Sequence, residues 1–359
     1  MKLKSLAAQS LCLALVLAGP AVPAPAAETM QVRGRFLYSA AGERVVLRGV
    51  NEMFVWSPDR TGPQTLPEIA RTGANAVRIM TMPAYSAEHL DAILGNSVAI
   101  GLIPMPECHA ATGKWEKLGE CVAYWTRPEI AAVIRKHRRW VLLNIANEAG
   151  AEVSREDFVS GYRDAIASIR AADIDVPLVI DGSDWGKEYR MLLDSWTTLN
   201  AADPRRAIVV SAHSYWVGTE EARKAPYRAI IARVTRDNIP FLLGEGPTPS
   251  GWDCKASPYQ WAMTELDRAE IGWLAWSWGM MPNGDCRAEK RYDITEGGKF
   301  GRWKSEAGEM LMISHPASIR NTSRRPCSIP QAGENCVRPE RSAAARRAAR
   351  NKRAAAKAD

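Results

Sequence analysis

The sequence predicts a closed (β/α)8 barrel, in which eight parallel strands form the wall and helices follow the strands. The first observation is that short apolar runs alternate with amphipathic stretches along the chain. The second is that these runs are apolar throughout, which is typical of parallel strands buried on both faces. The third is that none of the strand ends carries the glycine-rich turn of a doubly wound nucleotide-binding sheet. The spacing fits a single barrel domain of roughly 250 residues.

The predicted elements follow one another in regular order. The strand-like runs cover residues 44–51, 75–81, 102–109, 140–148, 177–183, 207–215, 240–246 and 272–278. The helical stretches include residues 66–74, 127–138, 155–173, 220–238 and 257–270, and a final helix is expected over 303–315. Since chemistry in such barrels collects at the carboxyl ends of the strands, this order also indicates where a site would form.

The amino end resembles a secretory signal peptide over residues 1–26. Lys2 and Lys4 precede an apolar run, and the small residues 24–26 offer a cleavage site. A membrane span is the alternative, but the run is short and two prolines interrupt its end. The sequence therefore predicts a secreted or periplasmic protein.

Export changes how the cysteines are interpreted. Cys12 would leave with the signal, and the remaining six would form disulfides in an oxidising compartment. Short loop closure favours the pairs Cys108–Cys121, Cys254–Cys286 and Cys327–Cys336. Other connectivities remain open, because spacing alone does not fix the pairing.

The net charge of +7 is concentrated at the two ends of the chain. The signal carries +2 and the segment from Arg338 carries +6, which leaves −1 for residues 28–337. The basic, alanine-rich segment 338–359 is expected to be a disordered, solvated tail; weak contact with a polyanion or an anionic envelope surface is the alternative. We expect no nucleic acid partner and a monomeric protein.

Three regions are expected after the signal. Residues 28–315 would form the barrel domain, and residues 316–337 a small appendage closed by a disulfide. The tail would occupy residues 338–359.

The predicted strand ends are rich in polar and aromatic side chains. They hold Asn51, Glu52, Arg78, His109, Asn147, Glu148, Asp181, Trp185, His213, Tyr215, Glu245, Trp276 and Trp278. Two carboxylates on strands four and seven, with hydrogen-bond donors and indole faces around them, are what cleavage of a glycosidic bond needs.

Several motifs resemble glycoside hydrolase family 5 of clan A. They are "NIANE" at strand four, "HSY" at strand six, "GEG" at strand seven and "GWLAWSW" at strand eight, and the likeness begins at "LRGVN". The bacterial β-mannanase branch is more similar than the cellulase branches. The resemblance implies a (β/α)8 TIM barrel and a retaining β-glycosidase that works without cofactor or metal.

The resemblance also implies roles for individual residues. Glu148 would be the acid/base and Glu245 the nucleophile, with Asn147 binding the 2-hydroxyl of the sugar. Arg78 and Tyr215 would hydrogen-bond Glu245 and keep it ionised.

Three further residues would contact the sugar under attack. His109 and His213 would line its subsite, and Trp276 would stack beneath it. Trp276 and Trp278 point to the same face of their strand, so one of them is expected to pack in the interior.

The chain departs from the mannanase pattern at three positions. Ala149 replaces an aromatic after the Asn-Glu pair, "GEGP" replaces "GEFG", and Ala110 replaces an aspartate. The reaction type is unaffected, because both glutamates remain. We expect cleavage of β-1,4-linked mannan or glucomannan, with cellulose-type glucan next; the alternatives are an exo-acting β-glycosidase and a non-catalytic carbohydrate-binding barrel.

Overall fold

Eight parallel strands close into a barrel in the computed structural model of this chain, which describes residues 28–283, 286 and 292–339. The strand order is β4-β5-β6-β7-β8-β9-β10-β11, and β11 pairs with β4 to complete the circle. The strands are β4 (Arg48–Glu52), β5 (Ala76–Thr81), β6 (Ile103–Cys108), β7 (Leu143–Asn144), β8 (Leu178–Asp181), β9 (Ile208–His213), β10 (Phe241–Glu245) and β11 (Gly272–Ala275). The predicted fold class is confirmed.

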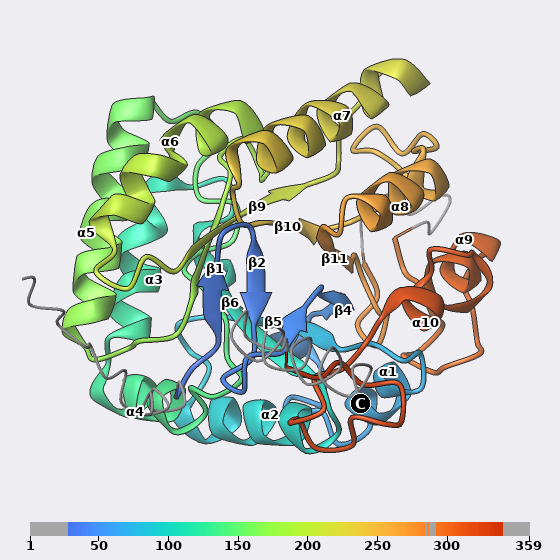
Figure 1. Ribbon diagram of the computed structural model, residues 1–359, viewed down its shortest axis with the longest axis horizontal. Coiled ribbons are helices and arrows are strands. Elements are labelled where there is room, and N and C mark those ends of the chain that lie inside the picture. Colours follow the sequence, from blue (N-terminus) through green and yellow to red (C-terminus); the bar gives the residue numbers. More distant parts are fainter. Residues whose placement is uncertain (1–27, 284–285, 287–291, 340–359) are drawn as a thin grey trace, which may run out of the picture.

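Helices surround the strands on the outside of the barrel (Figure 1). They are α1 (Thr65–Ala70), α2 (Ala87–Ala99), α3 (Leu118–Trp125), α4 (Pro128–Lys136), α5 (Arg155–Ala171), α6 (Tyr189–Ala202), α7 (Glu220–Asp237), α8 (Tyr259–Arg268), α9 (Glu306–Glu309) and α10 (Ile319–Thr322). In α5, the buried residues Phe158, Tyr162, Ile166 and Ile169 recur at helical spacing and face the strands. Ser154 begins this helix, because its side chain accepts a hydrogen bond from a backbone N–H of the first turn.

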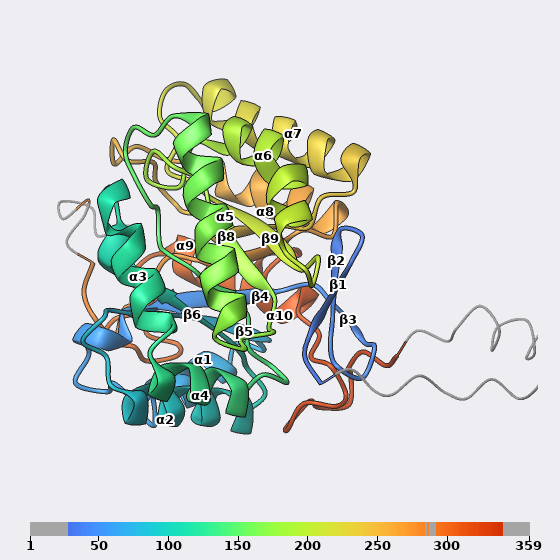
Figure 2. The same cartoon turned by 90° about the vertical axis from the view of Figure 1, so that its left-hand side faces the viewer.

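A small antiparallel sheet covers one end of the barrel (Figure 2). It consists of β1 (Gln31–Arg33), β2 (Phe36–Tyr38) and β3 (Arg44–Val45). Leu37 and Val45 from this sheet pack with Ile103 and Leu242 from the barrel strands in one apolar cluster. The sheet therefore closes the end of the barrel opposite to the carboxyl ends of the strands.

Two predicted strands differ from those observed. The run 44–51 splits into β3 and β4, because Val45 pairs with Leu37 of the small sheet whereas Val50 pairs inside the barrel. Of the run 140–148, only Leu143–Asn144 is regular strand.

The segment after β7 still runs along its neighbours. Ile145 N–H donates to the Val179 carbonyl at 3.0 Å, and Asn147 N–H donates to the Cys108 carbonyl at 2.9 Å. The chain therefore reaches the rim at Asn147 and Glu148, where it turns away from the barrel wall.

The predicted disulfides are present as Cys108–Cys121, Cys254–Cys286 and Cys327–Cys336. The last of these closes the segment that follows α10. The predicted final helix is α9, which continues into a wider turn over Met310–Ser314.

The predicted signal and nearly all of the basic tail lie outside the described residues. No helix in the described part of the chain has the length and apolar character needed to cross a bilayer.

Candidate active site

The two predicted glutamates meet at the carboxyl-terminal rim of the barrel. Glu245 is the last residue of β10, and Glu148 follows β7 on the far side of the rim. A carboxylate oxygen of each residue and a ring nitrogen of His213 all lie within 4.8 Å of one another. Both side chains are almost buried, with residue exposures of 6% for Glu148 and 3% for Glu245.

Glu245 is held by two donors. Arg78 Nη1 donates to Glu245 Oε1 at 2.8 Å, and the Tyr215 hydroxyl donates to Oε2 at 2.6 Å. Burial raises the pKa of Glu245 above the usual value of a glutamate, while the positive charges of His213 and Arg78 oppose the rise. The two donors fix the orientation of the carboxylate toward the mouth of the barrel.

The side chain of Glu148 is hydrogen-bonded to a histidine, His213. His213 Nδ1 lies 2.6 Å from Glu148 Oε1 and 3.5 Å from Glu245 Oε2. Burial alone would lower the pKa of His213, but the charges of Glu245 and Asp181 outweigh it and raise the pKa to about 10. A protonated His213 therefore sits between the two carboxylates. The backbone of Glu148 has a φ of 45°, which turns its side chain sharply out of the strand direction.

Asn147 and Arg78 form the floor of the site. Arg78 Nη2 donates to Asn147 Oδ1 at 2.6 Å, and Asn147 Nδ2 donates to Thr112 Oγ1 at 2.8 Å. The same guanidinium donates to Asn144 on β7 and to Asn51 on β4. These bonds consume the donors of Arg78 and leave Asn147 fixed at the rim.

His109 lies at the edge of the site. Its Nδ1 is 3.0 Å from Glu107 Oε1, and its ring meets the edge of Trp56 with centroids 5.6 Å apart. Burial alone would lower the pKa of His109. The negative charge of Glu107 and its hydrogen bond outweigh this effect, so the pKa of His109 is raised above its usual value.

The two tryptophans of the last strand have different surroundings. Trp278 is fully buried, and its Nε1 donates to the Gly298 carbonyl at 2.9 Å. Trp276 keeps 8% of its surface exposed and precedes a cis peptide bond to Ser277. Trp276 is thus the one of the pair that retains access to the mouth.

Asp181 takes a part in the site that the sequence analysis did not assign. This fully buried residue of β8 lies 3.2 Å from Arg78 Nη2 and 3.6 Å from His213 Nε2. Burial would raise its pKa, but His213 and Arg78 prevail and lower the pKa to about 2. The sequence placed Asp181 at a strand end, but its two partners come from two other strands, β5 and β9, which the sequence does not show to be in contact with it.

Glu52 is a second buried carboxylate with no role assigned from the sequence. It accepts hydrogen bonds from the backbone N–H groups of Met53 and Met280, at 2.8 and 2.9 Å. Burial raises its pKa to about 7, although the backbone donors oppose this. Glu52 joins β4 to the loop that follows Trp276 and Trp278.

Glu148, His213 and Glu245 are also the one group in the described ranges whose ligand atoms are close enough together for a metal ion. The short separation between His213 Nδ1 and Glu148 Oε1 is that of a hydrogen bond with a proton between the two atoms. A cation bound there would have to displace this proton. The hydrogen bond from His213 is sufficient to explain why the three side chains lie so close together.

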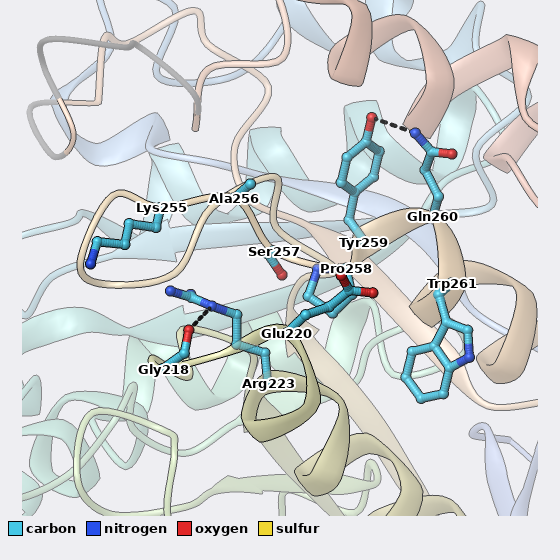
Figure 3. A pocket seen from close by; sticks show the side chains of 10 residues that line it. All are labelled: Gly218, Glu220, Arg223, Lys255, Ala256, Ser257, Pro258, Tyr259, Gln260 and Trp261. Atoms are coloured by element: carbon cyan, nitrogen blue, oxygen red, sulfur yellow. Dashed lines mark hydrogen bonds between the residues drawn. The ribbon is translucent and has the colours of Figure 1, made fainter.

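A cavity of about 550 Å³ lies away from these residues (Figure 3). It is bordered by the start of α7 and the start of α8, and Arg223 there donates to the Gly218 carbonyl at 3.0 Å. None of the predicted site residues lines it.

Several proteins of known activity resemble this chain. It is 29% identical over 341 residues to a mannan endo-1,4-beta-mannosidase of Cellvibrio japonicus, covering 90% of this chain and 74% of the relative. It is 28% identical to a second protein of that name from Salipaludibacillus agaradhaerens, covering 69% and 80%.

Solved structures of mannanases have a fold similar to that of this chain, at sequence identities close to those of the relatives above. The catalytic domain of a mannanase from Streptomyces sp. SirexAA-E superposes with a TM-score of 0.73 at 26% identity, covering 88% of this chain and 98% of that one. The mannohexaose complex of Thermomonospora fusca β-mannanase does so with a TM-score of 0.73 at 25% identity, covering 83% and 98%.

The family model described as Cellulase (glycosyl hydrolase family 5) matches residues 38–281, which is more than half of the 359 residues. The resemblance noted in the motifs is thereby confirmed. This protein belongs to glycosyl hydrolase family 5.

Proposed function

We propose that this protein is an exported, retaining endo-β-1,4-mannanase. The observation that carries the proposal is the approach of Glu148 and Glu245, since one carboxylate oxygen of each lies within 4.8 Å of one oxygen of the other. Retaining glycosidases place their two carboxyl groups about 5–5.5 Å apart, whereas inverting enzymes need about 6.5–9.5 Å to admit a water molecule. The short separation favours double displacement.

In the first step, Glu245 attacks the anomeric carbon of the sugar. Its carboxylate forms a covalent ester while the bond from the anomeric carbon to the glycosidic oxygen breaks. Glu148 gives its proton to that oxygen, and the leaving sugar departs with a new hydroxyl group. Oε1 of Glu148 faces His213, so Oε2 is the oxygen assigned to this transfer.

In the second step, Glu148 acts as a base. It takes a proton from water, the water oxygen attacks the anomeric carbon, and the ester to Glu245 breaks. Two inversions leave the anomeric configuration unchanged. Arg78 and Tyr215 hold the Glu245 carboxylate in place for its attack and stabilise it again when it is released.

Asn147, His109 and Trp276 are proposed to hold the sugar. Asn147 lies fixed beside Glu148 with its amide at the rim, where a 2-hydroxyl would meet it. Trp276 offers an indole face, and His109 a ring nitrogen, at the edges of the same mouth.

The relatives support mannan as the substrate, since both are mannan endo-1,4-beta-mannosidases by name. A screen of the purified protein on mannan, glucomannan and carboxymethyl-cellulose tests this choice. We expect chain scission of mannan into short oligosaccharides. Release of single sugars from chain ends would instead support exo action, and faster cleavage of carboxymethyl-cellulose would support a glucanase.

The two glutamate roles are tested with a matched pair of variants. Glu245→Ala and Glu148→Ala should each lower kcat on mannan by at least about three orders of magnitude. Added azide can then act as a small nucleophile in the space left by the side chain. Rescued Glu245→Ala should give an α-mannosyl azide, and rescued Glu148→Ala should give a β-mannosyl azide from an activated substrate. The opposite products would exchange the two roles, and near-parent turnover of Glu245→Ala would remove it from the nucleophile role.

Export is proposed from two features. The first is the signal-like order of residues 1–26, and the second is the presence of three disulfides, which form and persist in oxidising compartments. Finding the mature chain in the periplasm or the medium, beginning near residue 27, would support it; a cytoplasmic chain with intact residues 1–26 would not.

A further inference from the structure

We propose that a cavity at the amino-terminal end of the barrel binds the phosphate group of a small phosphate ester. The cavity lies apart from the two catalytic glutamates, and the inference does not depend on the proposed function. It starts from arginine side chains that share one cavity without carboxylate partners, because cations enclosed by protein are costly unless an anion or hydrogen bonds compensate them.

The cavity has a volume of about 370 Å³ and lies between α1 and the appendage. Its wall is formed by residues 70–73 at the end of α1, by Arg320 of α10, and by residues 323–325 and 331–335. Figure 1 shows α1 and α10 side by side, and Arg320 Nη2 donates to the Arg71 carbonyl at 2.9 Å. Since residues 70–73 lead into the start of β5, the cavity lies at the amino-terminal end of the barrel, opposite to the catalytic rim.

Four arginines line this cavity: Arg71, Arg320, Arg324 and Arg325. Two of them lie against one ring, since the guanidinium carbons of Arg71 and Arg320 are 4.5 and 5.4 Å from the ring centroid of Phe300. The body of the chain is nearly neutral, so four guanidinium groups around one cavity are a local concentration of positive charge. Like charges so close together repel one another unless an anion lies among them.

Most of these guanidinium groups have no carboxylate partner. Of the four, only Arg71 has one in the described ranges, Glu68 at 3.0 Å. Arg320, Arg324 and Arg325 donate to backbone carbonyls and form no salt bridge with any residue that the structure describes. Arg320 and Arg324 each make one such bond, although a guanidinium has five N–H donors. Most of their donors are therefore available to a ligand.

The charges around the cavity fit a phosphate group better than a carboxylate. The three arginines without a carboxylate partner carry +3, and Glu334, which also lines the cavity, contributes −1. The carbonyl groups at the end of α1 add about half a negative charge. The surplus of about one and a half positive charges matches a phosphate monoester, which carries about −1.5 to −2 at pH 7, whereas a carboxylate carries only about −1.

Two groups in the wall are incompletely compensated by the protein. Arg325 is half-buried, and burial lowers the pKa of its guanidinium. Ser323 is 7% exposed, and its hydroxyl has no hydrogen-bond partner within the described part of the chain. Phosphate oxygens accept hydrogen bonds from both kinds of group, and their geometry matches the planar guanidinium.

The form of the site favours a small ester in solution over the headgroup of a lipid. A volume of about 370 Å³ is at the lower end of ligand cavities, which commonly measure about 300–1,000 Å³. Ser323 is buried, so a ligand that approaches it must enter the cavity. A free phosphate ester can do so, whereas the surface of a bilayer cannot.

Calorimetric titration of the full chain with inorganic phosphate at low salt tests the site. The parent should show saturable binding, and Arg320→Gln/Arg324→Gln should weaken the affinity by about ten-fold or more, because two charge-assisted contacts are lost. The matched control Arg163→Gln/Arg228→Gln removes the same charge from exposed arginines of α5 and α7. Its affinity for phosphate should stay within about two-fold of the parent, since screening by salt limits distant charges.

Thermal unfolding provides a second measurement. A ligand that binds the folded state raises Tm by mass action, so phosphate should raise Tm of the parent and of the control variant. The increase for Arg320→Gln/Arg324→Gln should be less than about half as large. Vesicles of phosphatidic acid distinguish the source of the phosphate group: the two double variants should adhere to them equally, because the cavity takes the free ester.

A parent that binds no phosphate at concentrations up to about 10 mM would contradict the inference. Equal weakening in the two double variants would also contradict it, since general charge attraction would then explain the binding. Loss of phosphate binding on deletion of residues 340–359 would place the site in the tail instead. Weaker adhesion of Arg320→Gln/Arg324→Gln than of its control to the vesicles would assign the cavity to a lipid headgroup. Hydrolysis of mannan tests the proposed function separately.

Discussion

Arg78 shows how much one buried side chain contributes to the site. Its guanidinium donates to acceptors on strands one, four and seven of the barrel wall, including Glu245, and approaches Asp181 on strand five. Arginine suits this position because its planar group presents several donors in fixed directions. Neutralising Asp181 and Glu245 in the interior also avoids the large cost of unpaired buried charge.

Replacing Arg78 with lysine should therefore be harmful even though the charge is kept. The three N–H donors of lysine radiate from one nitrogen, so they cannot reproduce bonds that the guanidinium makes to Glu245, Asn144 and Asn147 from two separate nitrogens. We expect kcat on mannan to fall by about two orders of magnitude, and unfolding free energy to fall by about 3 kcal/mol. Steady-state kinetics and urea denaturation measure these effects. Arg71→Lys, on an exposed arginine paired with Glu68, is the control and should change neither.

His213 is expected to make stability depend on pH. Its pKa is about 10 in the folded protein and near 6.5 when unfolded, so the folded state binds one more proton between these values. The contribution is complete below pH 6.5 and declines as pH rises toward 10. Unfolding free energy of the parent should thus fall by several kcal/mol over this window.

A His213→Gln variant should lack most of that alkaline decline, while His89→Gln, outside the site, should keep it. Urea denaturation at a series of pH values is the measurement. An identical slope in parent and His213→Gln would show that His213 does not carry the charge assigned to it.

At the scale of single elements, two of the loops that follow barrel strands are held by specific bonds to other parts of the chain. Cys108 ends β6 and is bonded to Cys121 of α3, both fully buried. His109, the next residue, is thereby tied to a helix behind the barrel wall. Glu52 likewise holds the loop after β11 in place, because its carboxylate accepts hydrogen bonds from the backbone N–H groups of Met53 and Met280.

Removing the disulfide next to His109 should affect activity as well as stability. The double change Cys108→Ala and Cys121→Ala opens a loop with a sequence separation of 13 residues, which should cost about 3 kcal/mol of unfolding free energy. It should also raise KM on mannan several-fold, because His109 loses its anchor.

The pair Cys327–Cys336 provides the comparison, since it has a separation of 9 residues and lies in the appendage. Its removal should lower the melting temperature without changing KM. Equal effects of the two double variants on KM would argue against the local role of Cys108.

At the scale of the whole molecule, charge and catalysis are separated along the chain. The body from 28 to 337 carries a net charge of −1, and the segment from Arg338 carries +6. Cation-rich segments bind polyanions through long-range attraction that salt screens. The basic tail is therefore suited to polyanions, whereas the nearly neutral barrel is suited to an uncharged polysaccharide.

Deleting residues 340–359 should leave the hydrolysis of neutral mannan within about two-fold of the parent, because neither glutamate nor any of their partners is removed. Adhesion to an anionic polymer or vesicle, if the parent shows it at low salt, should disappear in the truncated protein. Reducing-sugar release and co-sedimentation at two salt concentrations measure the two properties. A large loss of hydrolysis would show that the tail contributes to the site.

The sequence by itself determined the order of the strands and which side chains come to their carboxyl ends. Glu148, Glu245, Arg78 and Tyr215 were predicted together because parallel strands of a closed barrel end at one rim, whatever the detail of the helices between them. Spacing favoured the three disulfides that the structure contains, since short loops close at least entropic cost, but it left other pairings open.

Only the tertiary structure decided how those side chains pair. The hydrogen bond between His213 and Glu148 and the ion pair of Asp181 with Arg78 depend on contacts between strands that are far apart in sequence. The strands β1 and β2 of the small sheet escaped prediction because they are too short to show a period. Local patterns specify which groups reach the rim, whereas the stagger of the closed barrel sets the distances between them.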